Sequence, residues 1–257
     1  MSTLVSNDFG RRLFYRARSL VYRSYFALAH ANYDRRLIAP RKRTPGGSFR
    51  SYELYNRHGR DEMLAELVDV TPPTATVYDV GASVGVYALA LVADDPRRTV
   101  IALEPAPATC ERLRANVALN GFDDRIDVQE CGVGNRTGSD RFFVSTYPEL
   151  SGFERESATR WEADVESEQT VAIVRLDDLD EIPEPDVLKI DVEGAAPDVL
   201  DGARTTLGEA RPTLFVEVHE DGLSRKTSTE VHGRLEALDY EISERTDYWR
   251  CDPREET

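Results

Sequence analysis

The chain has 257 residues, enough for one main domain with its own hydrophobic core and an extension. It carries 47 acidic and 32 basic residues, for a formal net charge of −15, so its surface is too acidic to attract nucleic acid. Lysine occurs only at positions 42, 189 and 226, and the other basic residues are arginines. An acidic surface poor in lysine predicts adaptation to a concentrated-salt cytoplasm, where counterions screen repulsion. Codon bias towards arginine is the alternative explanation.

The charge is divided unevenly along the chain. Residues 1–60 hold 13 basic and 3 acidic residues, whereas residues 61–257 hold 19 basic and 44 acidic ones. We therefore predict a basic helical arm and linker over residues 1–50 and a main domain over residues 51–257. Apolar residues at helical spacing predict that residues 11–43 either contact an anionic membrane surface at its inner face or pack on the acidic body.

Cysteine usage and hydropathy bear on location. Cys110, Cys131 and Cys251 show no CxxC motif and no metal-binding spacing, as expected of thiols in a reducing compartment. Arg16 and Arg18 interrupt the apolar region that an export signal would need. No apolar run is long enough to span a membrane. The sequence therefore predicts a cytoplasmic protein.

Helical and strand patterns alternate from residue 61 onwards. Periodicity and composition predict a helix over 61–70, a strand over 76–82, a helix over 84–93, a strand over 99–105, a helix over 107–121 and a strand over 125–134. After a polar insertion over 147–169, flanked by two strands, come a strand over 186–194, a helix over 196–210, a strand over 213–220, a helix over 228–239 and a hairpin over 240–251. Residues 40–50, rich in proline, glycine and basic residues, are predicted to be a linker. The alternation predicts an α/β fold whose parallel sheet is covered by helices on both faces.

A glycine-rich turn follows the first strand of this pattern. In DVGASVG (79–85), Gly81 allows a tight turn and Gly85 allows a ligand to approach the start of the next helix. Glu104, at the end of the second strand, is placed to accept two ribose hydroxyls. The sequence contains neither GxGxxG nor GxxxxGK[ST]. These features predict a nucleoside-containing ligand other than a dinucleotide or a nucleoside triphosphate.

Three motifs, DVGASVG, EPAPATCERLRANVALNG and LKIDVEGA followed by VLDGA, resemble the FkbM family of methyltransferases. The resemblance covers roughly residues 74–221. It implies a Rossmann-like class I methyltransferase fold with a mostly parallel seven-stranded sheet, and S-adenosylmethionine as cofactor. The cofactor-binding positions that it implies are Asp79, Gly81, Ala82, Gly85, Glu104, Asn120, Glu130 and Cys131. Asn116 matches the family's pattern in the same helix as Asn120. For Asn120, the alternative is a structural role at the helix end before Gly121.

The second candidate site lies in the motif KIDVEG. Strand alternation places Lys189, Asp191 and Glu193 on one side, where we expect them to face a polar cleft, because burying unpaired charges is costly. Glu217 and His219 alternate in the same way in the next strand, and the five residues are the predicted catalytic site. His219 or a carboxylate would take the proton of an acceptor hydroxyl. For Lys189, Asp191 and Glu193 the alternative is a buried ion-pair network. For His219 it is a position behind the residues that touch the substrate, or a salt bridge on the surface.

The remaining histidines carry no such pattern. His30, His58 and His232 lack a carboxylate motif and are predicted to be structural or surface residues. Clustered carboxylates suit Mg²⁺, but no spacing requires a metal, and none is predicted.

The resemblance implies an S-adenosylmethionine-dependent O-methyltransferase. The expected acceptor is a hydroxyl or uronic-acid carboxylate of a sugar or glycan, including a lipid-linked one, or another small molecule. Ala196 departs from the family pattern EGAE, which places an acid at this position, and the departure bears on the acceptor. The alternatives are a Rossmann enzyme that uses NAD or a nucleotide sugar, and a non-catalytic module that binds the cofactor or docks on a membrane.

Overall fold

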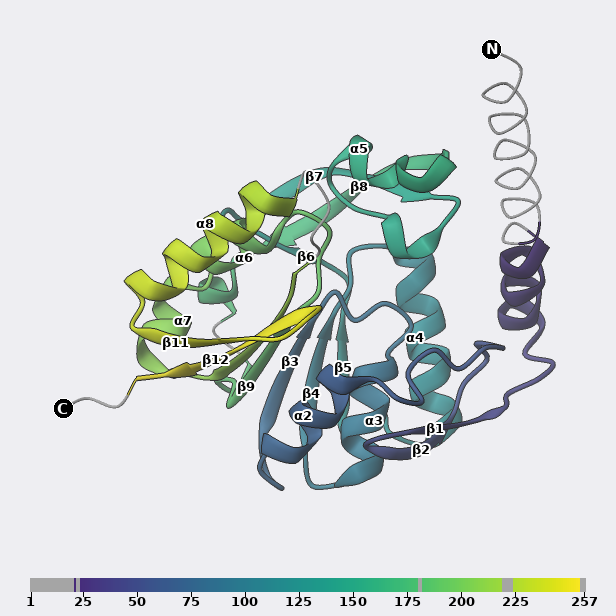
Figure 1. Cartoon of the computed structure of the whole chain (residues 1–257). Helices are drawn as coiled ribbons and strands as arrows, with labels where there is room; N and C mark the ends of the chain where they lie inside the picture. Colours follow the sequence, from purple (N-terminus) through teal and green to yellow (C-terminus); the bar gives the residue numbers. More distant parts are fainter. Residues whose placement is uncertain (1–20, 22–23, 180–181, 219–223, 255–257) are drawn as a thin grey trace, which may run out of the picture.

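The computed structural model describes residues 21, 24–179, 182–218 and 224–254. Its central sheet has seven strands in the order β11-β12-β10-β9-β3-β4-β5 (Figure 1). The strands are β3 (Thr76–Val80), β4 (Thr99–Leu103), β5 (Ile126–Gln129), β9 (Val187–Ile190), β10 (Thr213–Glu217), β11 (Tyr240–Glu244) and β12 (Tyr248–Pro253). The first five are parallel, and the hairpin β11–β12 joins them antiparallel to β10. The predicted mostly parallel seven-stranded α/β sheet is confirmed.

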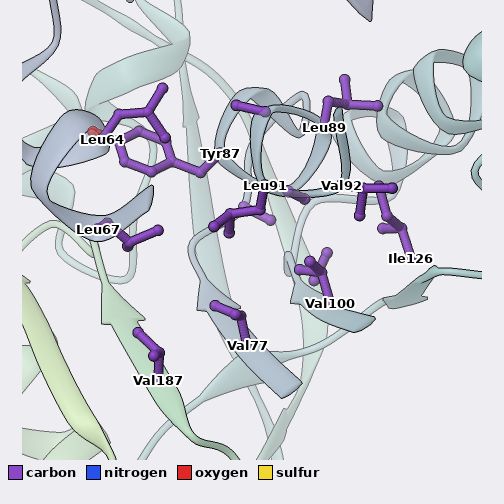
Figure 2. Packing of buried hydrophobic residues seen from close by; sticks show 14 of the residues in the cluster. Leu64, Leu67, Val77, Tyr87, Leu89, Leu91, Val92, Val100, Ile126 and Val187 are labelled. Carbon is purple, nitrogen blue, oxygen red and sulfur yellow. The ribbon is translucent and has the colours of Figure 1, made fainter. Parts of the chain in front are cut away.

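Helices cover both faces of this sheet (Figure 1). One face carries α2 (Glu62–Val70), α3 (Val86–Asp94) and α4 (Pro107–Asn120), and the other carries α6 (Ala196–Asp201), α7 (Arg204–Glu209) and α8 (Ser224–Ala237). Alternate strand residues supply the two cores, so that Val187 packs under α2 and α3 while Leu188 packs under the other group. Figure 2 shows the first core, with Leu64 and Leu67 of α2 above the strand residues. Burying one such leucine contributes about 2 kcal/mol.

The helix predicted over residues 196–210 is divided into α6 and α7. A Cβ added at Gly202 would lie 1.9 Å from the carbonyl oxygen of Gly134, so another part of the backbone touches the chain there. The carbonyl of Gly202 accepts a hydrogen bond from Asp177 N at 3.0 Å. A single glycine costs a helix only about 1 kcal/mol, so propensity alone does not end the helix here. The tertiary contact at Gly202 is what interrupts it.

Residues 41–50 differ from the predicted linker. They form the antiparallel strands β1 (Arg41–Thr44) and β2 (Gly47–Arg50), which pack on α3. Phe49 is buried in the core, and a Cβ at Gly46 would lie 2.7 Å from the carbonyl oxygen of Ala90. The composition that predicts a linker is therefore also that of a tight hairpin held close to a helix.

The described part of the basic arm is a helix over residues 24–35. Phe26 packs with Tyr147 and Leu150 of the insertion, and Asn32 Nδ2 donates to the carbonyl of Tyr52 at 2.6 Å. This part of the arm lies on the body of the protein, while most of the predicted helix before it lies outside the described residues. Contact with a membrane remains a prediction. Within the described residues, no helix is both long and apolar enough to cross a bilayer.

The insertion stands above one end of the sheet (Figure 1). It grows from a second sheet of order β6-β8-β7, formed by β6 (Gly132–Val133), β7 (Gly138–Ser145) and β8 (Val165–Val174). Between β7 and β8 lie η1 (Pro148–Leu150), α5 (Arg155–Ala158) and η2 (Arg160–Glu162), and η3 (Leu176–Asp178) follows β8. The antiparallel pairing of β7 with β8 thus holds a short helical region over the carboxyl ends of the central strands.

Candidate active site

A cavity of about 540 Å³ opens beside the carboxyl ends of β3, β4 and β9. The chain order reverses between β3 and β9, and ligands of doubly wound sheets bind at such a switch point. Three further segments complete the wall, namely the N-terminal helix, the loop over residues 51–58, and the insertion between β7 and β8. The cavity is therefore bounded on one side by strand ends and on the other by segments distant in the sequence.

The glycine turn after β3 is shaped by close backbone contacts. Gly81 has φ of 80°, and a Cβ there would lie 1.9 Å from the carbonyl oxygen of Asp191. The N–H groups of Gly81 and Ala82 both donate to the carbonyl of Leu103, at 2.9 and 3.1 Å. Gly85, with φ of 87°, begins α3. Only glycine at position 81 lets the ends of β3 and β9 approach this closely while keeping the left-handed turn.

Glu104 follows β4 and is 7% exposed. Its carboxylate oxygens accept hydrogen bonds from the backbone N–H groups of Ser83 and Ala106, each at 3.0 Å. Burial raises the pKa of Glu104 to about 7, against the opposing effect of these hydrogen bonds. Glu104 also lines the cavity, and each oxygen retains a second lone pair as an acceptor. The backbone thus orients a carboxylate for two neighbouring hydroxyl groups.

Lys189 lies in β9 beneath this turn and is 2% exposed. Its Nζ donates to Asp79 Oδ1 at 2.9 Å, lies 3.3 Å from Asp191 Oδ2, and stands 4.6 Å from the ring centroid of Tyr87. Burial lowers the pKa of Lys189, but attraction to the two aspartates outweighs burial and raises it. Lys189 therefore sits in a buried ion-pair network at the edge of the cavity, and not in an open cleft.

Carboxylates follow the ends of β9 and β10. Asp191, Glu193 and Glu217 all line the cavity. Burial, together with a hydrogen bond to Asp191, raises the pKa of Glu217 above its ordinary value. Glu193 pairs with Arg160 of the insertion, and both side chains are largely buried. The strand predicted over residues 186–194 ends at Ile190, so the loop after β9, and not strand alternation, brings Asp191 and Glu193 to the cavity. The insertion supplies a cation that sequence spacing did not connect to them.

The other predicted residues fall in different places. Asn120 exchanges hydrogen bonds with the backbone of Arg50, at 2.8 and 2.7 Å, and does not line the cavity. Glu130 pairs with Arg114 on the surface, and Cys131 is buried in the core, so neither lines the cavity. His219 lies outside the described residues. Asn116 Oδ1 accepts from Tyr52 N at 3.0 Å, which ties α4 to the loop that closes the cavity.

His58 corrects the prediction of a histidine without a carboxylate partner. Its Nδ1 lies 2.7 Å from Asp61 Oδ2, and its ring lines the cavity. His30 lines the cavity as well, whereas His232 lies on α8 beside Glu236. The pair of His58 with Asp61 could have been found from the spacing HxxD, because Asp61 is also the capping residue of α2.

Ala196 stands where the family pattern has an acid, at the start of α6. It is 4% exposed and belongs to the core beneath α6 and α8. A carboxylate of the insertion lies nearby, since a Cβ added at Gly194 would be 3.4 Å from Glu154 Oε2. The position is therefore filled by apolar packing, with an acid approaching from another segment.

The residues around the glycine turn fit S-adenosylmethionine. Glu104 lines the cavity beside this turn and is oriented for a ribose diol, while a Cβ at Gly81 would collide with the carbonyl of Asp191. The predicted cofactor-binding residue Asp79 is buried, pairs with Lys189 and does not line the cavity. Within the same residues, no group of three or more His, Cys, Asp or Glu side chains is arranged to hold a metal ion.

Comparisons with known proteins agree with these features. The family model "Methyltransferase FkbM domain" matches residues 79–242. The chain is 27% identical to the AMB antimetabolite synthetase AmbE of Pseudomonas aeruginosa, over 73% of this chain and 10% of that protein. It is 30% identical to the 31-O-demethyl-FK506 methyltransferase FkbM of Streptomyces tacrolimicus, over 58% of this chain and 66% of that protein. It thus spans a tenth of the first relative's length and just under two thirds of the second's.

A solved structure, the methyltransferase FkbM of Methylobacillus flagellatus, is 21% identical over 70% of this chain and 44% of that chain, with a TM-score of 0.48. The family match favours the methyltransferase prediction over the enzyme that would use NAD or a nucleotide sugar. Because the family model covers more than half of the sequence, the chain belongs to the FkbM family of methyltransferases, with S-adenosylmethionine as its cofactor.

Proposed function

We propose that the enzyme methylates an oxygen atom of a sugar or glycan. The observation that carries this proposal is a pair of exposed aromatic side chains on the cavity wall, Tyr55 at 64% and Trp161 at 57% exposure. A sugar ring has apolar C–H faces and hydroxyl edges, and flat aromatic side chains can cover the first while polar groups bind the second. Glu193 and Arg57 supply such polar groups in the same cavity.

Trp161 has an unusual backbone conformation that supports this role. Its φ of 55° and ψ of 36° lie in the left-handed region, which is rare for a bulky residue. The guanidinium of Arg160 stands 5.8 Å from the centroid of its ring, and Arg160 is itself paired with Glu193. Strained residues cluster at ligand-binding sites. The arrangement presents an aromatic face beside the cavity at some cost in backbone energy.

The name of one relative supports oxygen as the acceptor atom, because the Streptomyces tacrolimicus protein is described as a 31-O-demethyl-FK506 methyltransferase. When bound, S-adenosylmethionine supplies an electrophilic methyl group. The contribution of this chain is to hold an acceptor oxygen in line with that group, and such positioning provides a large part of catalysis in two-substrate reactions. The insertion and the loop over residues 51–58 form the wall that would do so.

The test is a methylation assay of the full chain at molar salt. Methyl-labelled S-adenosylmethionine is incubated with a panel of methyl glycosides and methyl hexuronides, and the products are analysed by mass spectrometry. We expect label in at least one sugar acceptor, and calorimetry should show binding of S-adenosylmethionine and its demethylated product but not of NAD. A chain that binds the cofactor yet labels only amines or carbon acceptors would refute the proposal.

A matched pair of variants tests the aromatic wall. Trp161→Ala should raise KM for the sugar by about tenfold, since an aromatic contact is worth roughly 1 kcal/mol or more. Trp161→Phe should restore most of the affinity. Neither change should alter cofactor binding, because Trp161 belongs to the insertion, whereas the glycine turn and Glu104 belong to the ends of β3 and β4.

The basic arm supports a lipid-linked acceptor as part of the same proposal. Val21, Leu28, Leu37 and Ile38 are at least 60% exposed, and Arg35, Arg36, Arg41 and Arg43 are exposed in the same region. Apolar side chains flanked by arginine suit an anionic bilayer surface. Flotation of the full chain with phosphatidylglycerol vesicles should carry protein upward, and the double change Leu37→Ser and Ile38→Ser should reduce it. Absence of flotation of the wild type would remove the membrane contact, and equal flotation of both proteins would show that it does not involve Leu37 and Ile38.

A further inference from the structure

We propose that the pair His58–Asp61 is the general base of the reaction, and hence that the acceptor is a hydroxyl group and not a carboxylate. The inference rests on the proposed function and deepens it. His58 lies on the loop that closes the cavity, and its Nδ1 lies 2.7 Å from Asp61 Oδ2. Among the described residues, its Nε2 has no hydrogen-bond partner, and the side chain is 32% exposed.

Asp61 is held so that it can orient the imidazole. As the capping residue of α2, it accepts a hydrogen bond from Leu64 N at 2.9 Å, and its Oδ2 also accepts one from Tyr87 Oη at 2.9 Å. Burial raises the pKa of Asp61, but the hydrogen bonds from His58, Leu64 N and Tyr87 outweigh burial and lower it. An ionised Asp61 places the imidazole proton on Nδ1, because Nδ1 must then donate. Nε2 is left as the acceptor.

Tyr87 connects this pair to the catalytic end of the sheet. Its ring packs edge to face against His58, with centroids 5.7 Å apart, and Lys189 Nζ stands 4.6 Å from the ring centroid. Lys189 in turn lies 3.3 Å from Asp191, which lines the same cavity as His58. The imidazole thus stands one aromatic ring away from the strand ends at which the cofactor binds.

Three acids that follow or end the central strands are less suited to take a proton. Glu217 is hydrogen-bonded to Asp191, Glu193 is paired with Arg160, and Glu104 accepts two backbone hydrogen bonds. His58 carries no such competing contact on Nε2 within the described residues. The charged or titratable groups nearest to it are Asp61 from α2, Tyr87 from α3, Lys189 behind Tyr87 and Arg57 beside it in the loop.

The chemistry that follows is a single proton transfer coupled to methyl transfer. The acceptor O–H proton moves to His58 Nε2 as the oxygen forms its bond to the methyl carbon. Bound S-adenosylmethionine would supply the methyl group and retain the electron pair of the carbon–sulfur bond on its sulfur. The imidazolium is stabilised by Asp61, and its exposure lets the proton leave to solvent. A uronic-acid carboxylate is already ionised at neutral pH and would need no base, which is why the pair points to a hydroxyl.

The experiment compares His58→Gln and Asp61→Asn with the control His232→Gln, which alters a histidine on α8 outside the cavity. Turnover is measured at saturating cofactor from about pH 5 to 9, on whichever panel sugar the wild type methylates. His58→Gln should lower kcat at neutral pH by about 100-fold. Cofactor affinity should change by less than about twofold, because His58 does not contact the glycine turn. His232→Gln should behave as wild type.

Asp61→Asn tests the positioning role with a readout besides activity. In ¹⁵N spectra of histidine-labelled full chain, the wild type should show His58, assigned by its loss in His58→Gln, with the proton on Nδ1. Asp61→Asn should shift it towards the Nε2-protonated tautomer and lower kcat. A wild-type His58 protonated on Nε2 would contradict the inference without any substrate.

The outcomes separate the two proposals. A sugar hydroxyl methylated at an unchanged rate by His58→Gln overturns the base and leaves the proposed function standing. Methylation confined to a hexuronide carboxylate, with no loss of rate in His58→Gln, likewise overturns the base and leaves the proposed function standing. Failure of the wild type to methylate any sugar, although it binds S-adenosylmethionine, overturns the proposed function and the base with it.

Discussion

The two halves of the cavity are built in different ways. The half next to β3, β4 and β9 is made from strand ends joined by the main sheet, with Gly81 pressed against the carbonyl of Asp191. The opposite half is assembled from the N-terminal helix, the loop over residues 51–58 and the insertion. Contacts made by side chains join these segments, among them Arg57 with Glu149 and Tyr25 with Glu53.

The difference indicates a division of labour. Backbone contacts fix the half at the strand ends, the proposed cofactor half, so this half has little freedom to vary. The opposite half, which we propose binds the acceptor and call the acceptor half, depends on a few side-chain contacts between segments. These contacts can change without disturbing the sheet. Substrate choice is therefore expected to reside in the second half, and mutations in the two halves should separate cofactor binding from acceptor binding.

The largest effect is expected from Gly81→Ala. The new Cβ would meet the carbonyl of Asp191 at 1.9 Å, so β3 and β9 would have to move apart at the cofactor site. We expect a loss of roughly 3 kcal/mol or more in the free energy of unfolding and of at least about 100-fold in affinity for S-adenosylmethionine. Urea unfolding and calorimetry measure the two.

Gly121→Ala is the matched control for this change. Gly121 also has a positive φ, of 68°, but a Cβ there would meet no atom within 4 Å. It should therefore cost only the about 1 kcal/mol of the left-handed conformation and leave cofactor binding intact. Equal losses in the two variants would mean that backbone conformation, and not the contact with Asp191, makes glycine necessary at position 81.

Glu104 should make cofactor binding depend on pH near neutrality. Its pKa is raised to about 7 by burial, whereas a ribose diol donates to the ionised form. Affinity for S-adenosylmethionine should therefore fall below pH 7, by up to about tenfold per pH unit. Calorimetry across this range measures the slope, which Glu104→Gln should abolish.

The same group should act on stability with the opposite sign. Because the folded pKa of Glu104 lies above the ordinary value of 4.5, the folded protein binds more protons than the unfolded chain between the two values. The contribution of Glu104 to stability is then present below pH 4.5 and is lost as pH rises to about 7. Urea unfolding of wild type and Glu104→Gln in the absence of cofactor should show this difference. Parallel pH profiles in the two proteins would contradict it.

The cofactor half is also the half that the sequence made predictable. DVGASVG and Glu104 act through strand ends and turns, whose consequences follow from local spacing. KIDVEG placed Asp191 and Glu193 near Glu217, and all three line the cavity, but β9 ends at Ile190 and strand alternation does not extend to these two acids. Local spacing could not show that Lys189 would be buried, because that depends on Asp79 in another strand.

The acceptor half was largely hidden from sequence reasoning. The hairpin over residues 41–50 resembles a linker in composition, and only its packing on α3 distinguishes the two. His58 is three residues from Asp61, but its position in the cavity depends on contact of the loop with Tyr87, which lies far along the chain. The pairing of Arg160 with Glu193 is likewise a tertiary contact. The hairpin, the position of His58 and the Arg160–Glu193 pair each depend on contacts between residues far apart in the sequence, which no local pattern specifies.

Arg160→Ala should affect the acceptor half alone. The change removes the cation that joins the insertion to Glu193, where both side chains are largely buried. We expect kcat/KM for the sugar acceptor to fall by about tenfold or more, with little change in cofactor affinity, because one partner of a buried pair is lost. Steady-state kinetics and calorimetry separate the two effects.

Arg155→Ala is the control within the same insertion. Arg155 pairs with Glu168, but its side chain is 62% exposed and that of Glu168 is 41% exposed. Exposed pairs contribute little, so this variant should stay within about twofold of wild type. If Arg155→Ala were as impaired as Arg160→Ala, the insertion would be acting through general stability and not through its contact with Glu193.

The smallest effect, salt dependence, should differ in sign between the two halves. The net charge of −15 repels itself across the body, so raising KCl from about 0.1 to 1 M should stabilise the sheet, on the order of 1 kcal/mol. The same screening should weaken half-exposed pairs between segments, such as Arg57 with Glu149 at 3.1 Å. Hydrogen exchange should then show slower opening of α3 but faster opening of residues 24–35 and 51–58 as salt rises.

Because the screening length at 1 M is already about 3 Å, both trends should level off above that concentration if screening is their cause. Continued slowing of exchange in α3 at higher salt would instead indicate ion binding to the acidic surface, and slowing in both halves would mean that apolar contacts such as those of Phe26 dominate the acceptor half.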